Sequence, residues 1–304
     1  MKVVITGGTG FIGRNLCGKL SAAGYKVVAL TRNAAKAAAT LGSTAECISW
    51  DGMTSGEWCK EIDGAEAVIN LAGANLADKP WTNAYKKIIL DSRINAGKAI
   101  AQAIQSAAKK PAVLLQGSAI GIYGNGGEET INEESPFGNG FLADVVQRWE
   151  ASVEDVATTT RLVFLRTGVV LGAGEGTLAK MELPFKLFAG GPPGGGKQWF
   201  SWVHIEDTTD SIQFLLENKN VTGAFNLTAP NPTQMGTFCK ELANALNRPS
   251  WLPVPAFALR ALLGEMAEET VLASQNVLPQ RLLEAGFKFK FENVADALNK
   301  IYSE

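Results

Sequence analysis

Short apolar runs alternate with longer amphipathic stretches along the first two thirds of the chain. The apolar runs predict buried strands at residues 3–5, 26–30, 67–70, 113–116 and 162–165, and one more just before Trp50. Helical periodicity covers the stretch after residue 11 and residues 84–108 and 141–157. Strands that alternate with helices predict an α/β fold, in which a doubly wound parallel sheet carries helices on both faces.

The first strand leads directly into a glycine-rich turn, TGGTGFIG. Gly7, Gly10 and Gly13 are three residues apart, and the apolar residues that follow recur at the spacing of one helix face. In this context glycines permit the tight turn, the approach of a pyrophosphate and close packing of helix on strand. The helix N-terminus adds unpaired N–H groups and partial positive charge. The segment predicts a dinucleotide site in a Rossmann-type sheet. The alternative is a turn that only connects the strand to the helix.

The second strand indicates which dinucleotide is bound. A free ribose 2′-hydroxyl usually meets an Asp or Glu about 20 residues past the glycines. This chain has no acidic residue from Arg14 to Ala45, and its second strand ends in Thr31 and Arg32. A guanidinium there can pair with a 2′-phosphate. We therefore expect NADP(H). The alternative, that Arg32 is an ordinary solvated charge, stays open.

Residues that follow the other strands are candidates because ligands of such sheets lie beyond the carboxyl ends of the strands. Asp51 follows the third strand and could accept a hydrogen bond from an adenine amino group. Leu71, Ala72 and Gly73 follow the fourth, and their small size lets the backbone pass over a ribose. Ser118 follows the fifth strand. Asp51, Ala72 and Ser118 could equally be turn or strand-end residues.

A Gly/Pro-rich segment at residues 172–197 interrupts the alternation, and the chain from residue 231 onward is mostly helical in pattern. We predict that residues 1–173 and 200–228 form the NADP-binding Rossmann domain. Residues 174–199 and 229–304 would then form a smaller, mostly helical substrate lobe.

Composition narrows the class of protein. The chain has 304 residues, 46% hydrophobic residues and a net charge of −2, so nucleic acid and membrane are not expected as partners. Its four cysteines lie apart, and with a single histidine they form no recognisable metal site. We expect a cytoplasmic protein with reduced thiols and a small-molecule substrate, and leave a homodimer open.

Nearly the whole chain resembles the extended short-chain dehydrogenase/reductases, and more narrowly the NAD-dependent epimerase/dehydratase-like family. The matching segments are TGGTGFIG, NLAGAN, DSRINAGKAI, GSAIGIYG, RTGVVLGAGEG, WVHIEDTTD and a C-terminal run that begins with PVPAFALRALL. The resemblance implies cofactor contacts at Thr9, Gly10, Phe11, Ile12, Thr31, Arg32, Leu71, Ala72, Arg93 and Val169. Arg93 would lean toward the cofactor phosphates, or be a charge on a helix surface.

The chain departs from the family in its proton-transfer groups. Active members resemble one another in a Ser or Thr after the fifth strand and a Tyr-x-x-x-Lys on the next helix. No Tyr-x-x-x-Lys exists in this sequence, and by spacing its place falls near Phe141 and Val145. Neither side chain can move a proton.

Ser118 is in place for the serine of the family pattern. The candidates to replace the missing pair are Tyr123, Asp144 on the helix that would have carried the tyrosine, and His204. Ser118 could hydrogen-bond a substrate oxygen, and Tyr123 could transfer a proton, although packing is the alternative for Tyr123. His204 fits a structural role better. The sequence thus predicts an NADP(H)-binding oxidoreductase or epimerase-like protein acting on a small carbonyl or sugar-like substrate. The alternative is a non-catalytic NADP(H)-binding sensor or scaffold.

Overall fold

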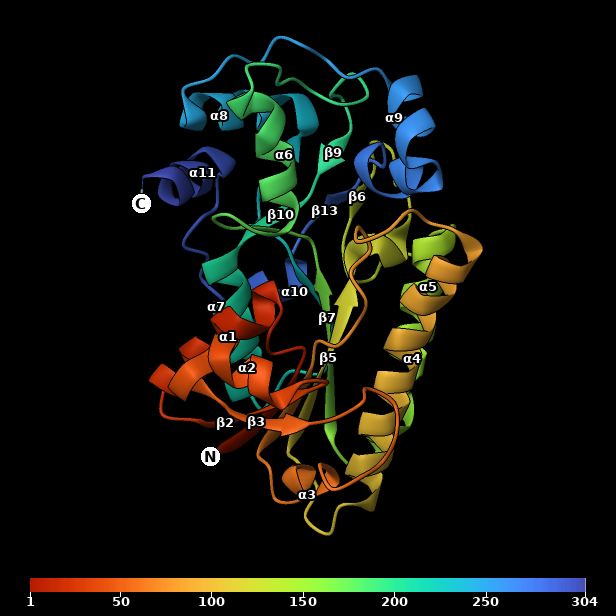
Figure 1. Cartoon of the computed structure of the whole chain (residues 1–304), viewed down its shortest axis with the longest axis vertical. Helices are drawn as coiled ribbons and strands as arrows, with labels where there is room; N and C mark the ends of the chain where they lie inside the picture. The colour runs from red at the N-terminus through yellow and green to blue at the C-terminus, as the bar shows by residue number, and fades with distance from the viewer. Residues whose placement is uncertain (304) are drawn as a thin grey trace. The chain divides into compact units, whose positions relative to one another are not determined.

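The computed structural model describes residues 1–303 (Figure 1). The strands are β1 (Lys2–Thr6), β2 (Lys26–Thr31), β3 (Glu46–Ser49), β4 (Ala67–Asn70), β5 (Val113–Ala119), β6 (Thr130–Ile131), β7 (Arg161–Thr167), β8 (Val169–Leu171), β9 (Trp199–Phe200), β10 (Trp202–His204), β11 (Gly223–Leu227), β12 (Thr233–Gln234) and β13 (Asn276–Val277). The α-helices are α1 (Phe11–Ala22), α2 (Ala34–Leu41), α3 (Cys59–Ile62), α4 (Asn83–Ser106), α5 (Phe141–Ala151), α6 (Gly176–Lys186), α7 (Ile205–Glu217), α8 (Met235–Leu246), α9 (Ala256–Leu263), α10 (Gln280–Glu284) and α11 (Val294–Tyr302). Short 3₁₀ turns are η1 (Gly42–Thr44), η2 (Ile120–Tyr123) and η3 (Glu154–Thr158), and η4 (Ala267–Val271) is a π-helix.

The predicted α/β fold is confirmed by a seven-stranded sheet with the order β11-β7-β5-β4-β1-β2-β3. The pairs β1–β2, β2–β3, β1–β4 and β4–β5 all run parallel. Their register places Thr6 level with Leu30 and with Asn70, and Asn70 level with Gln116. The carboxyl ends of these strands therefore form one edge, where the predicted cofactor residues begin.

The two faces of this sheet are buried by different helices, as alternation along each strand requires. Val4, Val68 and Leu114 belong to a core cluster that includes the small residues of α4. Small residues allow close packing: a Cβ on Gly97 of α4 would lie 2.1 Å from the Ser152 hydroxyl oxygen. On the opposite face, a Cβ on Gly8 would contact Cys17 of α1 and Ala29 of β2.

The chain divides into two compact units, and each is described by itself below. Unit 1 comprises residues 1–118, 145–165 and 209–224, and unit 2 comprises residues 119–144, 166–208 and 225–304. Four stretches of the predicted nucleotide-binding domain belong to unit 2, namely residues 119–144, 166–173, 200–208 and 225–228. The core of unit 2 is formed by α6, α8 and α11, with Phe200 and Trp202 packed among them.

Sequence reasoning missed α6 and misplaced one helix end. The helix α6 lies inside the Gly/Pro-rich segment and contains Pro184, yet buries Leu178 and Phe185 in the core of unit 2. Proline is normally unfavourable inside a helix, so core burial outweighs local propensity here. The helix predicted at residues 141–157 ends at Ala151, and a 3₁₀ turn follows it.

Candidate functional site

A row of polar side chains crosses the carboxyl edge of the sheet in unit 1. The Thr6 hydroxyl donates to Asn70 Oδ1 at 2.5 Å, and Asn70 Nδ2 donates to Gln116 Oε1 at 2.9 Å. All three residues are fully buried. The backbone N–H groups of Leu71 and Ala72 donate to Thr6 Oγ1 at 3.1 Å. This row, which we call the polar ladder, fixes the backbone that leaves β4.

The glycine turn packs directly on that backbone. Gly7 has φ +68°, and a Cβ on it would lie 2.6 Å from the Leu71 carbonyl oxygen. Gly10, the N-cap of α1, has no side chain to cap the helix, and the first turn of α1 contains no acidic residue. The N-terminus of α1 therefore lacks an anion of its own, as a site for a ligand's diphosphate requires. Thr9 and Gly10 are exposed, and Phe11 and Ile12 are half-buried.

Arg93 of α4 lies behind Gly73 in the same unit. Its Nη1 donates to the carbonyl oxygens of Ala74 at 3.1 Å and Ile89 at 3.0 Å, and its guanidinium stacks 5.1 Å from the Trp149 ring centroid. Desolvation lowers the pKa of Arg93 to about 10. No carboxylate among residues 1–303 pairs with it, and its Nε and Nη2 donate to none of these residues. A desolvated cation with unused donors is suited to bind an anion.

The end of β2 presents Thr31 and Arg32. Arg32 is exposed and makes no hydrogen bond or ion pair with any residue that the structure describes. The neighbouring Asn33 caps α2, because its Oδ1 accepts from Lys36 N at 2.9 Å. The guanidinium of Arg32 is thus available to a ligand, whereas the side chain of Asn33 already caps α2.

Asp51 follows β3 at the same edge and is exposed. Its carboxylate accepts hydrogen bonds from the N–H groups of Met53 and Thr54 and from the Thr54 hydroxyl. The hydrogen bond from the Thr54 hydroxyl and those from backbone N–H groups lower the pKa of Asp51. The carboxylate stabilises its own turn, and its predicted contact with adenine stays a prediction.

Ser118 lies at the end of β5 and is 5% exposed. Its hydroxyl donates to Glu150 Oε1 of α5 at 2.5 Å, and Glu150 is equally buried. Because the hydroxyl proton is directed at Glu150, Ser118 could only accept a hydrogen bond from a substrate. The catalytic role of Ser118 stays a prediction, and the geometry gives it a structural partner.

Tyr123 and Val169 belong to unit 2. The Tyr123 hydroxyl donates to Asn226 Oδ1 at 2.8 Å and accepts from Arg166 Nη1 at 3.0 Å. Burial raises the pKa of Tyr123, whereas a tyrosine that transfers protons near neutrality needs a lowered pKa. These contacts favour packing as the role of Tyr123. Val169 begins β8 and donates its N–H to the Ser201 carbonyl oxygen at 2.9 Å.

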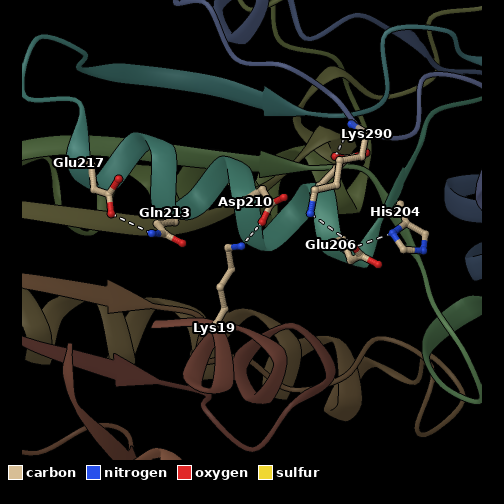
Figure 2. A network of polar contacts seen from close by, with 8 residues as sticks. Lys19, His204, Glu206, Asp210, Gln213, Glu217 and Lys290 are labelled. Carbon is tan, nitrogen blue, oxygen red and sulfur yellow. Dashed lines mark hydrogen bonds and ion pairs between the residues drawn. The ribbon is translucent and has the colours of Figure 1, made fainter. Parts of the chain in front are cut away.

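His204 has the structural surroundings that the sequence analysis favours. Its Nδ1 accepts from Glu206 N at 3.2 Å (Figure 2). The centroid of its ring lies 4.1 Å from that of the Phe291 ring. The fully buried Asp207 carboxylate accepts from the N–H groups of Lys290 at 2.8 Å and Phe291 at 3.0 Å. Residues 204–207 thereby hold the C-terminal segment of unit 2.

Unit 1 therefore brings together most of the predicted cofactor residues at one sheet edge: the glycine turn, Thr31, Arg32, Asp51, Leu71–Gly73 and Arg93. Sequence reasoning missed the polar ladder, Trp149 and Glu150. Thr6, Asn70 and Gln116 did carry a signal, since each is a polar residue closing an apolar strand. Trp149 and Glu150 carried none, because their role depends on how α5 packs on the sheet.

Comparison with known proteins agrees with this architecture. The chain belongs to the NAD dependent epimerase/dehydratase family, whose model matches residues 3–228. A domain of unknown function (DUF1731) matches residues 254–301. The chain is 42% identical to the epimerase family protein SDR39U1 homolog, chloroplastic, of Arabidopsis thaliana, over 99% of this chain and 86% of that protein. It is 38% identical to the epimerase family protein YfhF of Bacillus subtilis, over 100% of this chain and 99% of that one.

Solved structures resemble the chain over its full length. The crystal structure of the human epimerase family protein SDR39U1 with NADPH has a TM-score of 0.89 and 32% identity, and covers 100% of this chain and 99% of that one. A UDP-glucuronic acid 4-epimerase from Bacillus cereus has a TM-score of 0.80 at 16% identity, covers 100% of this chain and 98% of that one, and shows the fold alone. No helix within residues 1–303 is both long and apolar enough to span a bilayer.

Proposed function

We propose that the chain binds NADP(H) and is an oxidoreductase or epimerase-like enzyme for a small carbonyl or sugar-like substrate, without a Tyr-x-x-x-Lys relay. The observation that carries the proposal is that two guanidinium groups, at the sheet edge that carries the glycine turn, have no carboxylate partner in the described part of the chain. Arg32 is exposed and Arg93 is desolvated, and neither has a carboxylate partner among residues 1–303. The NADPH in the human structure, 32% identical to this chain, supports the same cofactor.

The residues present fit this dinucleotide. Gly7 and Gly13 have no Cβ, which allows the turn to pack against the carbonyl groups of Leu71 and Gly7. The uncapped N-terminus of α1 offers N–H groups to a diphosphate. Arg93 would contact the phosphates through its unused donors, and Arg32 would select the 2′-phosphate. When bound, the nicotinamide supplies a hydride acceptor or donor. The chain's own residues would bind, orient and shield the cofactor from water.

A titration of the purified chain with NADPH and NADH tests the proposal. We expect NADPH to bind at least tenfold more tightly, because a bidentate guanidinium–phosphate contact contributes about 1.5–3 kcal/mol. Arg32→Ala should narrow the difference by lowering NADPH affinity alone, and Lys36→Ala on the same exposed surface is the control. Equal affinities of the unmodified chain for both cofactors would refute the proposed selectivity.

The alternative is a cofactor-binding sensor or scaffold without turnover. It is favoured by one group of observations: Phe141 begins α5, the Tyr123 hydroxyl has two buried partners, and Ser118 donates to Glu150. Oxidation of bound NADPH on a panel of aldehydes and ketones separates the two functions. If NADPH raises the melting temperature and no compound consumes it, the sensor is the better description. A homodimer and a cytoplasmic location also stay proposals.

A further inference from the structure

Residues 267–278 of unit 2, which we call the clamp segment, contact two stretches that come far earlier in the chain. The clamp segment lies inside the part matched by the domain of unknown function. One contacted stretch is the loop at residues 119–127, which follows β5 and contains Tyr123. The other is residues 138–142, which lead into α5 and include its first two residues. All three stretches belong to unit 2.

Glu269 caps the helix α5. Its Oε1 accepts from Phe141 N at 3.0 Å, and its Oε2 accepts from Leu142 N at 3.0 Å. The first N–H groups of a helix have no partner inside it, and a carboxylate there is also favoured by the helix dipole. Gly140 precedes the helix and has no side chain for this task. Its φ is +109°, and a Cβ on it would lie 2.3 Å from Glu269 Oε1. Glu269 therefore supplies to α5 a cap from a distant part of the sequence.

In the π-helix η4, the adjacent residues Glu268 and Glu269 contact different partners. Its widened turn is closed by the hydrogen bond from Leu272 N to the Ala267 carbonyl oxygen at 2.8 Å. Glu269 in this turn reaches α5, whereas the neighbouring Glu268 is exposed and pairs with Arg260. Isolated π-turns are rare and occur often at functional sites. Glu268 is thus a matched internal control for Glu269.

The same segment holds the loop after β5. Gln275 Nε2 donates to the carbonyl oxygens of Ile120 at 3.0 Å and Gly124 at 2.8 Å. Ser274 N donates to Asn125 Oδ1 at 3.1 Å, and Gly126 N donates back to the Ser274 carbonyl oxygen at 2.9 Å. These bonds satisfy backbone groups that an irregular loop would otherwise leave without partners.

The loop and the start of α5 also contact each other. Gly138 N donates to the Ile122 carbonyl oxygen at 2.9 Å. A Cβ on Gly138 would lie 2.1 Å from the Tyr123 carbonyl oxygen, so the two backbones touch. A shift of one stretch would therefore displace the other.

We infer that the clamp segment is a positioning element for the loop that contains Tyr123 and for the start of α5, and that Glu269 is the positioning residue that fixes the first turn of α5. The clamp segment thus assigns a structural role to part of the domain of unknown function. Its bearing on catalysis rests on the proposed function, because the family resemblance puts the place of the missing Tyr-x-x-x-Lys near Phe141 and Val145. The positioning itself rests only on the contacts within unit 2.

Amide hydrogen exchange of the full chain, followed by NMR, tests the inference. Glu269→Ala should speed exchange of the Phe141 and Leu142 amides at least tenfold, because both N–H groups lose a charged acceptor. Glu269→Gln keeps one accepting oxygen and should restore protection at one of these two amides. Glu268→Gln should leave both amides unchanged. Unchanged exchange in Glu269→Ala, or an equal effect of Glu268→Gln, overturns the inference.

An NADPH titration separates this inference from the proposed function. The glycine turn belongs to unit 1, so we expect the NADPH Kd of Glu269→Ala to stay within about twofold of the unmodified chain. If exchange rises across the strands of the sheet as well, Glu269 supports the whole fold and the inference fails. If Glu269→Ala does not fold, the pattern in Glu269→Gln decides. Failure of the unmodified chain to bind NADPH would remove the proposed function and leave the exchange result intact.

Discussion

Gly13 of α1 lies against Gly7 so closely that a Cβ on Gly13 would be 2.2 Å from the Gly7 carbonyl oxygen. The obstacle is backbone, which cannot rotate away as a side chain can. Gly7 in turn lies against the Leu71 carbonyl, so the turn, the helix and the end of β4 are held in mutual contact. This contact leads to the first prediction.

Gly13→Ala should destabilise the chain by about 1–3 kcal/mol, because overpacking against fixed backbone forces local shifts. It should also weaken NADPH binding, since the turn would have to open. Gly18→Ala on the same helix is the control, because a Cβ there meets nothing within 4 Å and alanine favours helix. Urea denaturation and an NADPH titration measure both effects. Similar losses in the two variants would show that the contact with Gly7 is unimportant.

Arg93→Met should raise the NADPH Kd roughly tenfold to a hundredfold, since it removes a charge whose unused donors contact the phosphates in our proposal. Fluorescence titration of NADPH measures the change. The exposed Lys98 on the same helix provides the comparison, and Lys98→Met should leave the Kd within about twofold. If both substitutions weaken binding equally, general electrostatic attraction accounts for the result.

Thr6→Val keeps the shape of the side chain and removes the hydroxyl at one end of the polar ladder. The Leu71 and Ala72 N–H groups lose an acceptor and Asn70 Oδ1 loses a donor, which should lower the free energy of unfolding by about 1–3 kcal/mol. The exposed Thr40 also donates one hydrogen bond, to the Lys36 carbonyl oxygen, yet Thr40→Val should change stability by less than about 0.5 kcal/mol. A Thr6→Val chain as stable as the parent would contradict the role of the ladder.

Glu133 gives a prediction about pH. Burial raises the pKa of Glu133, although hydrogen bonds from the N–H groups of Asn226 and Arg281 oppose the shift. The folded chain therefore binds the proton more tightly than the unfolded chain. Stability from this group is fully present below the unfolded pKa and is lost as the pH rises through the folded pKa. Glu133→Gln should remove this dependence.

Urea denaturation at several pH values checks the expectation. The parent chain should lose stability relative to Glu133→Gln as the pH increases from 4 toward neutrality. The exposed Glu134→Gln should follow the parent at every pH. A constant difference between the parent and Glu133→Gln would mean that the carboxyl titrates alike in both states.

The strands and the glycine turn could be predicted because their signals are local. Each apolar run is long enough for one buried strand. Gly7, Gly10 and Gly13, between an apolar run and a helical pattern, are typical of a dinucleotide-binding turn. Arg32 could be singled out because the acid expected at the end of β2 is missing. The helix α6 could not be predicted, because Pro184 argues locally against a helix, whereas burial of Leu178 and Phe185 stabilises it.

Pairs that join distant residues were also beyond sequence reasoning. Ser118 meets Glu150 across 32 positions, and Glu269 meets Phe141 across 128. Both contacts depend on how a helix lies against other elements, which no local pattern encodes. Ser118 and Tyr123 were chosen by residue type, and the structure gives both hydroxyls internal partners.

The Asp207 carboxylate ties α7 to the far end of the sequence through the Lys290 and Phe291 amides. In a chimaera with α7 from one relative and the C-terminal tail from another, the carboxylate and its two amide donors would come from different proteins. A chain truncated before Lys290 would remove these two amide donors from a buried carboxylate and so destabilise the fold more than trimming at the surface would. In engineered variants, the stretch around Asp207 should therefore be exchanged together with the residues from Lys290 onward.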